Sequence, residues 1–319
     1  MATPSSTTRA KRGGVTLNGL LQVAAVLTVL FSVLTAIDTR QHYIEMFSHF
    51  RLQYLVASLL LIVFAVKRRA TYSALIVVAL GLNAAYVLPC YSDNTAATGD
   101  TRLKFLYANV QAKNQDHEHL IDLINSERPD VIVLQEVSAH WLEALQTLNA
   151  GYPFSYSAAR EDNFGIAMWS RQPYASATHV DSPPLDYPTI IASVRMGGTD
   201  LTLISTHPMI PLGRENFAAR NAQLQSVSEI VAQASGEVLL LGDLNASVWG
   251  RHYRRFEAST GLRNARRGVG VLPTWPTFMP VAMIPIDHAL VSSGIGIADI
   301  KTGPHIGSDH LPLIVTVVF

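Results

Sequence analysis

The sequence has a single cysteine, Cys90, among its 319 residues. An intrachain disulfide is therefore excluded, and the lone thiol neither supports nor opposes an oxidising compartment. The chain also lacks internal repeats, and it has no low-complexity stretch beyond a Ser- and Thr-rich N-terminal tail. These absences argue against a disulfide-stapled fold and against a repeat architecture.

Charged residues are scarce as well. They make up 15% of the chain, and the mean hydropathy is +0.22, which is too apolar for an ordinary soluble enzyme of this size. The uncharged stretches lie near the N-terminus. Three runs there carry no charged residue: Leu17–Ile37, Leu52–Val66 and Tyr72–Leu88. A signal peptide could explain the first run but not all three. We therefore expect a three-helix transmembrane anchor over 17–90, in which the short second span borrows Phe47–Phe50 while Arg51 snorkels to the interface.

Flanking charges predict the orientation of this anchor. Cations precede the first run and link the second to the third, whereas the loop between the first and second has fewer cations and balances them with acids. The positive-inside rule then places residues 1–16 in the cytoplasm as a tail. Residues 91–101 form a linker, and 102–319 form an extracytoplasmic or periplasmic domain, so the expected location is the cytoplasmic (inner) membrane.

Positive charge is deficient in the exported part. Residues 93–319 hold 16 Lys and Arg against 22 Asp and Glu, a net charge of about −6. A protein that tracks nucleic-acid phosphates usually carries the opposite balance, so nucleic acid is an unlikely partner. One basic cluster between Arg251 and Arg267 is the exception.

Apolar runs rich in β-branched residues alternate with helical patterns from residue 102 onward. Several expected strands follow one another without a helix between them, as in 165–171, 189–196 and 201–207. This α/β pattern favours mixed or antiparallel sheets with helices on their outer faces over a doubly wound parallel sheet.

Polar residues end these apolar strands repeatedly. Singly, each one is more often a cap, a turn residue or a satisfied core group. Together they are expected to meet in one cleft, because strands that terminate side by side bring their ends together. The set is Asn109, Glu136, His207, Asp243, Asn245, Asp287, Asp309 and His310.

Over about 102–319 the chain resembles the endonuclease/exonuclease/phosphatase superfamily. The resemblance lies in a series of short motifs, which follow one another in the order N, QE, SR, TH, GDLN, IDH and SDH. The resemblance implies a four-layered α/β sandwich of two mixed β-sheets flanked by helices, preceded here by three transmembrane helices. It also implies a metal-dependent phosphoric ester hydrolase that uses Mg²⁺ or Mn²⁺. Glu136 would be the principal metal ligand, with Asn109 beside it, and Asp309 would complete the metal or base site.

The remaining roles are implied by the same resemblance. Asp243 would orient or deprotonate the attacking water, and Asn245 would hold that water or a phosphate oxygen. His207 and His310 would donate to phosphoryl oxygens, while Asp287 would fix His310. This chemistry is physically coherent, because a hard dication prefers oxygen ligands and stabilises charge on a phosphoryl group.

Two departures from the family pattern concern the substrate. Many relatives carry an arginine before the aspartate of IDH, whereas this chain has Pro285 and Ile286. The phosphate-side tyrosine of apurinic endonucleases has no clear counterpart, and Asn163 is its candidate replacement. Arg220 could contact phosphate or form a salt bridge on a helix surface.

A phosphoesterase at the outer face of a membrane most plausibly meets a phosphorylated lipid or a polyprenyl pyrophosphate. Trp275 belongs to an apolar stretch before Asp287 that could bind a chain, enter the bilayer interface or pack on the domain itself. The anchor and domain together resemble the glycopeptide-resistance-associated membrane branch. A nuclease and a non-catalytic scaffold remain alternatives, and no obligate protein partner is evident.

Overall fold

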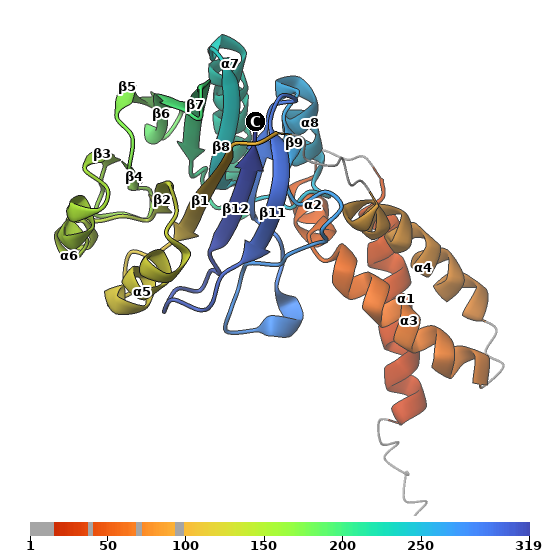
Figure 1. The fold of residues 1–319 in the computed structure, drawn as a ribbon. Helices are drawn as coiled ribbons and strands as arrows, with labels where there is room; N and C mark the ends of the chain where they lie inside the picture. The colour runs from red at the N-terminus through yellow and green to blue at the C-terminus, as the bar shows by residue number, and fades with distance from the viewer. Residues whose placement is uncertain (1–15, 38–40, 68–71, 93–98) are drawn as a thin grey trace, which may run out of the picture.

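The computed structural model describes residues 16–37, 41–67, 72–92 and 99–319. In the last of these ranges, two six-stranded sheets pack face to face (Figure 1). The first has the order β11-β12-β1-β2-β4-β3 and the second β5-β6-β7-β8-β10-β9. The β1–β2 and β7–β8 pairs are parallel and the other pairs antiparallel, so both sheets are mixed, as predicted.

The strands of the first sheet are β1 (Arg102–Asn109), β2 (Val131–Gln135), β3 (Phe154–Ala158), β4 (Ile166–Ser170), β11 (Gly296–Thr302) and β12 (Leu313–Val318). Those of the second are β5 (Tyr174–Ser182), β6 (Tyr187–Met196), β7 (Thr199–Thr206), β8 (Glu237–Asp243), β9 (Arg263–Asn264) and β10 (Asp287–Val291).

Helices cover the two outer faces and complete four layers. The α5 (His117–Glu127) and α6 (Ala139–Ala144) helices pack on the first sheet, and α7 (Gly213–Gln233) and α8 (Arg251–Thr260) pack on the second. Alternation along β1 shows how the sequence builds these layers. Leu103, Phe105 and Tyr107 enter the core between the sheets, while Leu106 and Ala108 face the α5 side. The predicted fold class is confirmed.

The N-terminal part forms a separate helical bundle that projects from the sandwich (Figure 1). It contains α1 (Leu17–Leu34), α2 (His42–Ser48), α3 (Arg51–Lys67) and α4 (Ser73–Val87), which a short 3₁₀ turn, η1 (Leu88–Tyr91), follows. By length and composition two helices could cross a membrane, at Leu17–Leu34 and Ser73–Tyr91. The axes of α2 and α3 form an angle of 63° with each other. The two helices make a third candidate span only if this bent pair crosses the membrane as a single span.

Arg51 does not snorkel, and this part of the prediction was wrong. Its side chain is fully buried where α2 meets α3. One guanidinium nitrogen donates to the Ser32 carbonyl (3.1 Å) and to Asn83 Oδ1 (3.0 Å), and the group lies over the Tyr86 ring at 4.0 Å. Partners from α1 and α4 thus replace the water that snorkelling would have supplied.

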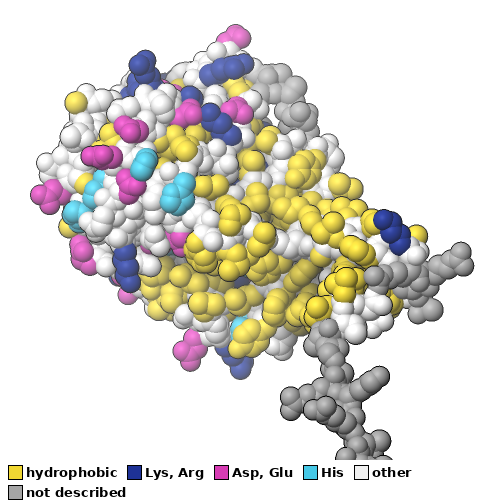
Figure 2. All heavy atoms as spheres, turned by 90° about the horizontal axis from the view of Figure 1, so that it is seen from below, with side chains coloured by type: hydrophobic (Ala, Val, Ile, Leu, Met, Phe, Trp, Pro, Cys, Tyr) yellow, Lys and Arg dark blue, Asp and Glu magenta, His cyan; other side chains and the backbone are white. Residues whose placement is uncertain are grey.

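Several hydrogen bonds fasten the helical part to the sandwich. The Gln53 amide donates to the Met283 carbonyl (2.8 Å), and the Trp249 indole donates to the Tyr86 carbonyl (3.0 Å). Figure 2 shows hydrophobic side chains gathered over the bundle and continuing onto the adjoining face of the sandwich. Residues 1–15 of the predicted tail, the cations of the 68–71 loop and most of the linker lie outside the described residues, so the orientation stays a prediction.

Candidate active site

Strand register brings the polar residues to one end of the sandwich. Asp243 on β8 is the direct cross-strand partner of Asp287 on β10, and Asn109 on β1 is aligned with Gln135, the residue before Glu136. A cavity of about 430 Å³ opens at this end. Its polar lining from the sandwich consists of Gln111, Glu136, Asn163, His207, Asp243, Asn245, Asp309 and His310, and His49 lines it from the bundle. No Lys or Arg of the described residues lines it.

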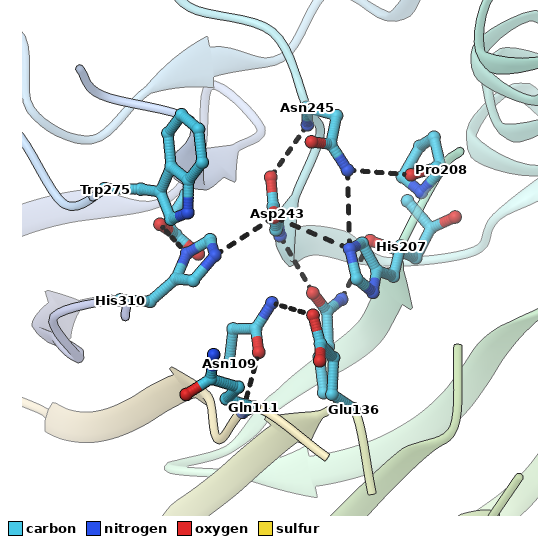
Figure 3. A network of polar contacts seen from close by, with 12 residues as sticks. Asn109, Gln111, Glu136, His207, Pro208, Asp243, Asn245, Trp275 and His310 are labelled. Carbon is cyan, nitrogen blue, oxygen red and sulfur yellow. Dashed lines mark hydrogen bonds and ion pairs between the residues drawn. The ribbon is translucent and has the colours of Figure 1, made fainter. Parts of the chain in front are cut away.

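Glu136 lines the cavity, and Asn109 lies behind it, outside the lining (Figure 3). The Asn109 amide donates to one Glu136 carboxylate oxygen (2.9 Å), and the Ala112 backbone N–H donates to the other (3.1 Å). These bonds aim the carboxylate, yet they leave lone pairs on both oxygens. In the described part of the chain, no Lys or Arg forms an ion pair with Glu136.

Asp243 lies between two imidazoles. One of its carboxylate oxygens is 3.5 Å from His207 Nε2 and 3.8 Å from His310 Nε2, and the other accepts the Asn245 backbone N–H (2.8 Å). Burial opposes a charge on His207, but the hydrogen bond and charge of Asp243 outweigh it and raise the pKa of His207. The Asn245 side chain donates to the Pro208 carbonyl (2.9 Å), which fixes its position beside His207.

Asp287 holds His310 from the side away from Asp243. Its carboxylate is 2.9 Å from His310 Nδ1, and its other oxygen accepts the Tyr107 hydroxyl (2.8 Å). Burial disfavours charge on His310, but Asp287 outweighs it and raises the pKa of His310 to about 10. Burial and Asp287 raise the pKa of Tyr107 well above its usual value, so its hydroxyl remains a donor. Both nitrogens of His310 therefore face carboxylates.

The Gly307–His310 segment is built to carry two side chains into the cavity. Gly307 has φ +83°, and a Cβ there would come within 2.6 Å of Asn114 Oδ1, so both conformation and space require glycine. The Ser308 hydroxyl donates to the Asn109 carbonyl (2.8 Å) and accepts the His310 backbone N–H (3.1 Å). The carboxylate of Asp309 accepts the Trp275 indole N–H (2.9 Å) at the cavity wall.

Backbone strain accumulates around the cavity. Six described residues other than glycine have positive φ, and three of them line it: Gln111 (+56°), Glu136 (+62°) and Asn245 (+48°). Asparagine tolerates this conformation, but for glutamate and glutamine it costs free energy. Such strain persists when surrounding contacts fix the residue, as the two donors to Glu136 do.

Sequence reasoning assigned no role to Gln135, which joins the two sheets beneath the site. Its amide nitrogen donates to Ser205 Oγ (3.0 Å) and to the Thr206 carbonyl (2.8 Å). Its oxygen accepts the Asp243 backbone N–H (2.9 Å), and it shares the one proton of the Tyr107 hydroxyl, 2.9 Å away, with Asp287. The sequence did contain a signal for this contact. Gln135 and Tyr107 are polar residues inside otherwise apolar strands, and such buried groups need hydrogen-bond partners.

Arg220 is the one predicted substrate residue that does not line the cavity. Its guanidinium is fully buried, pairs with Glu45 of α2 (2.8 Å) and donates to the Asn245 carbonyl (3.1 Å). It is therefore neither on a helix surface nor placed to contact phosphate. The other two candidates, Asn163 and Trp275, do line the cavity.

A family model now decides the classification. The model for the Endonuclease/Exonuclease/phosphatase family matches residues 106–310, which carry every site residue predicted from the sequence. The chain belongs to the endonuclease/exonuclease/phosphatase family. Members of this family are metal-dependent hydrolases of phosphoester bonds. No curated protein sequence gives a significant match.

Solved structures support the same fold at low identity. D. rerio TDP2, solved with a single-strand DNA product, is 17% identical, with a TM-score of 0.57 over 69% of this chain and 100% of that chain. The human Nocturnin catalytic domain with bound sulfate is 19% identical, with a TM-score of 0.56 over 70% and 96%. Sphingomyelinase C from Streptomyces griseocarneus is 17% identical, with a TM-score of 0.50 over 69% and 100%.

Two sets of residues are candidates for binding a divalent metal. Asp243, Asp287 and His310 place ligand atoms within 4.8 Å of one another. However, Asp287 already holds His310 Nδ1 at 2.9 Å, so this pair is engaged in a contact of its own. Asn109, Glu136 and Asp309 offer oxygen atoms only, as a hard dication prefers. The carboxylates facing a cavity without Lys or Arg fit a bound cation.

Proposed function

We propose that the chain is a membrane-anchored, divalent-metal-dependent phosphoesterase that acts on a lipid or polyprenyl phosphate ester at the outer face of the cytoplasmic membrane. The observation that carries the proposal is the composition of the cavity. The polar groups at the strand ends line one part of it, which we call the polar floor, and apolar side chains line another, which we call the apolar wall. The wall consists of Tyr43, Met46, Phe47 and Phe50 of the α2 region, where His49 also lines the cavity, and of Ile210, Pro211 and Leu212 after β7.

The apolar wall suits a substrate with a long hydrocarbon chain. The α2 helix belongs to the bent apolar pair, so a chain lying along it can pass from the cavity toward a bilayer without crossing water. Leu212 is 61% exposed, and Phe47 is 41% exposed. Both line the same cavity, so a lipid substrate bound there would cover them.

The polar floor supports hydrolysis at phosphorus. We assign the metal to Asn109, Glu136 and Asp309, where, when bound, it would neutralise charge on the phosphoryl oxygens. The Asp243 carboxylate takes a proton from the attacking water, whose oxygen bonds to phosphorus as the ester P–O bond breaks. The same proton later passes to the leaving oxygen. The N–H groups of His207 and His310 donate to the phosphoryl oxygens, and Asp287 keeps His310 in place.

A nuclease fits this cavity less well. The relative from D. rerio was solved with single-strand DNA, but here no arginine or lysine of the described residues lines the cavity. The basic residues between Arg251 and Arg267 also lie outside its lining. A non-catalytic scaffold would have no use for strained Glu136 or for the linked Asp287–His310 pair.

A substrate panel tests the proposal directly. Full-length protein in lipid nanodiscs would be stripped of metal, reloaded with Mg²⁺ or Mn²⁺, and given a polyprenyl pyrophosphate, a phosphodiester lipid and single-stranded DNA. We expect metal-dependent turnover of at least one lipid and at most slow cleavage of DNA. Preference for DNA would establish the nuclease, and no turnover of any substrate would favour the scaffold. Glu136→Gln is the matched inactive control.

A further inference from the structure

A second cavity lies where the bundle meets the sandwich, and it is separate from the catalytic one. We call it the junction pocket. It has a volume of about 550 Å³ and is lined by the end of α4 and η1 on one side and by α8 and the segment after it on the other. No residue lines both this pocket and the catalytic cavity. Its charged lining is three arginines and one glutamate: Arg254, Arg266, Arg267 and Glu257.

Arg266 is the unusual member of this lining. Its side chain is only 1% exposed, and no carboxylate pairs with it among the described residues. One terminal nitrogen donates to the Asp287 carbonyl, but Nε and the other terminal nitrogen are buried without a hydrogen-bond partner. A buried guanidinium with unused donors is costly, and such a group calls for a water, an ion or a ligand as its partner.

The other charges do not neutralise Arg266. Glu257 is already bound to Arg267 (2.9 Å) and accepts the Asn264 backbone N–H (3.1 Å). Arg254, at the rim, is exposed, and its guanidinium lies 5.8 Å from the centroid of the Tyr86 ring. The pocket therefore offers an uncompensated positive charge at its base and a second one at its mouth, a combination that suits an anion with several acceptor oxygens.

The position of the pocket indicates which anion meets it. Tyr86, Pro89 and Cys90 belong to the last turns of the Ser73–Tyr91 candidate span, so the pocket lies at the level where such a helix leaves the hydrocarbon core. Leu88 and Tyr91 beside it are more than half exposed, as expected for side chains at a membrane interface. Phosphate groups of lipids lie at this depth.

We propose that the junction pocket binds a phosphate-type anion, with Arg266 as the buried donor and Arg254 as the outer one. The source of the phosphate is the headgroup of an anionic membrane lipid or free inorganic phosphate. This assignment explains why the basic cluster after Arg251 exists in a domain of net negative charge. It uses none of the residues that line the catalytic cavity.

The chain carries a built-in probe for this site. Cys90, its single cysteine, lines the pocket and is half-buried, so alkylation of the whole protein reports on this place alone. The rate of modification by N-ethylmaleimide would be followed by intact mass at constant pH. Full-length protein would be placed in nanodiscs of phosphatidylcholine and given increasing fractions of phosphatidylglycerol, or increasing inorganic phosphate.

We expect saturable protection of Cys90 from alkylation. Protection by phosphatidylglycerol alone identifies a lipid headgroup as the anion, and protection by inorganic phosphate identifies the free ion. Arg254→Gln should raise the half-protecting concentration about tenfold, the loss typical of one charge-assisted hydrogen bond. Arg266→Gln should raise it at least as much. Arg255→Gln, one residue along α8 and outside the pocket lining, should leave it unchanged.

Three results would overturn the proposal. Cys90 could be alkylated at the same rate under all conditions, which would mean that the pocket holds only water. The Arg254 and Arg255 variants could lose protection equally, which would mean that surface charge alone attracts the anion. In the Arg254→Gln variant the anion could protect Cys90 at the same half-protecting concentration as in wild type, which would mean that Arg254 does not bind it. If Arg266→Gln fails to fold, Arg254→Gln still decides the question, because Arg254 is exposed and its loss does not disturb the core.

Discussion

The pair of Asp287 and His310 offers the sharpest test of the catalytic geometry. The two side chains are buried and in contact at 2.9 Å, and Tyr107 donates to the other Asp287 oxygen. Asp287→Asn keeps the shape and an acceptor for Tyr107 but removes the negative charge beside His310. His310→Ala removes a charged donor to the phosphoryl group, which typically costs 10²–10³-fold in rate. We expect a loss of that order for each variant.

The double variant distinguishes a linked pair from two independent residues. If Asp287 acts through His310, the double variant should be little worse than His310→Ala alone, because residues acting as a unit fail together. The assay is kcat on a phosphate ester at saturating Mg²⁺, with the melting temperature checked for each variant. Losses that simply multiply, or a normal rate for Asp287→Asn, would refute the reasoning.

Four further predictions follow from other contacts. Glu136→Gln should lower activity steeply, and excess Mg²⁺ should restore it only partly; full activity in a metal titration would place the ion elsewhere. Glu45→Gln should destabilise the fold by about 3–5 kcal/mol, because it leaves Arg220 buried without its partner; an unchanged melting temperature in detergent would contradict this. Gln135→Leu should cost about 2–4 kcal/mol by stranding buried donors and acceptors, and unfolding at the wild-type denaturant concentration would speak against its bridging role. A reporter fused after Phe319 should be active only outside the cytoplasm, and cytoplasmic activity would reverse the expected topology.

Sequence reasoning worked where burial leaves a strong pattern. The strands that carry Asn109, Asp243 and Asp287 are buried on both faces. Their apolar runs and the polar residues that end them can therefore be recognised in the sequence. Strands at the rim were missed for the opposite reason. Most positions of β3 and β5 are exposed or half-exposed, so they contain no apolar run to detect.

The sequence could not reveal contacts between distant segments. Glu45 and Arg220 are 175 residues apart, and each one alone resembles an ordinary surface charge. Their pairing depends on α2 bending away from α3 and packing against the sandwich, which no local pattern encodes. The same bend buries Arg51 among other helices, and it carries Met46 into the wall of the catalytic cavity.

The central claim is that the apolar wall of the catalytic cavity binds the hydrocarbon chain of the substrate. Full-length protein would be assayed for kcat/KM on a polyprenyl phosphate ester and on the same headgroup ester with a short chain. Leu212→Ser changes an exposed wall residue, and Leu185→Ser changes an exposed residue outside the cavity lining.

We predict that wild type prefers the long chain, that Leu212→Ser lowers kcat/KM for the long chain by about tenfold while sparing the short one, and that Leu185→Ser changes neither. Equal kcat/KM for both chain lengths in wild type would contradict the account.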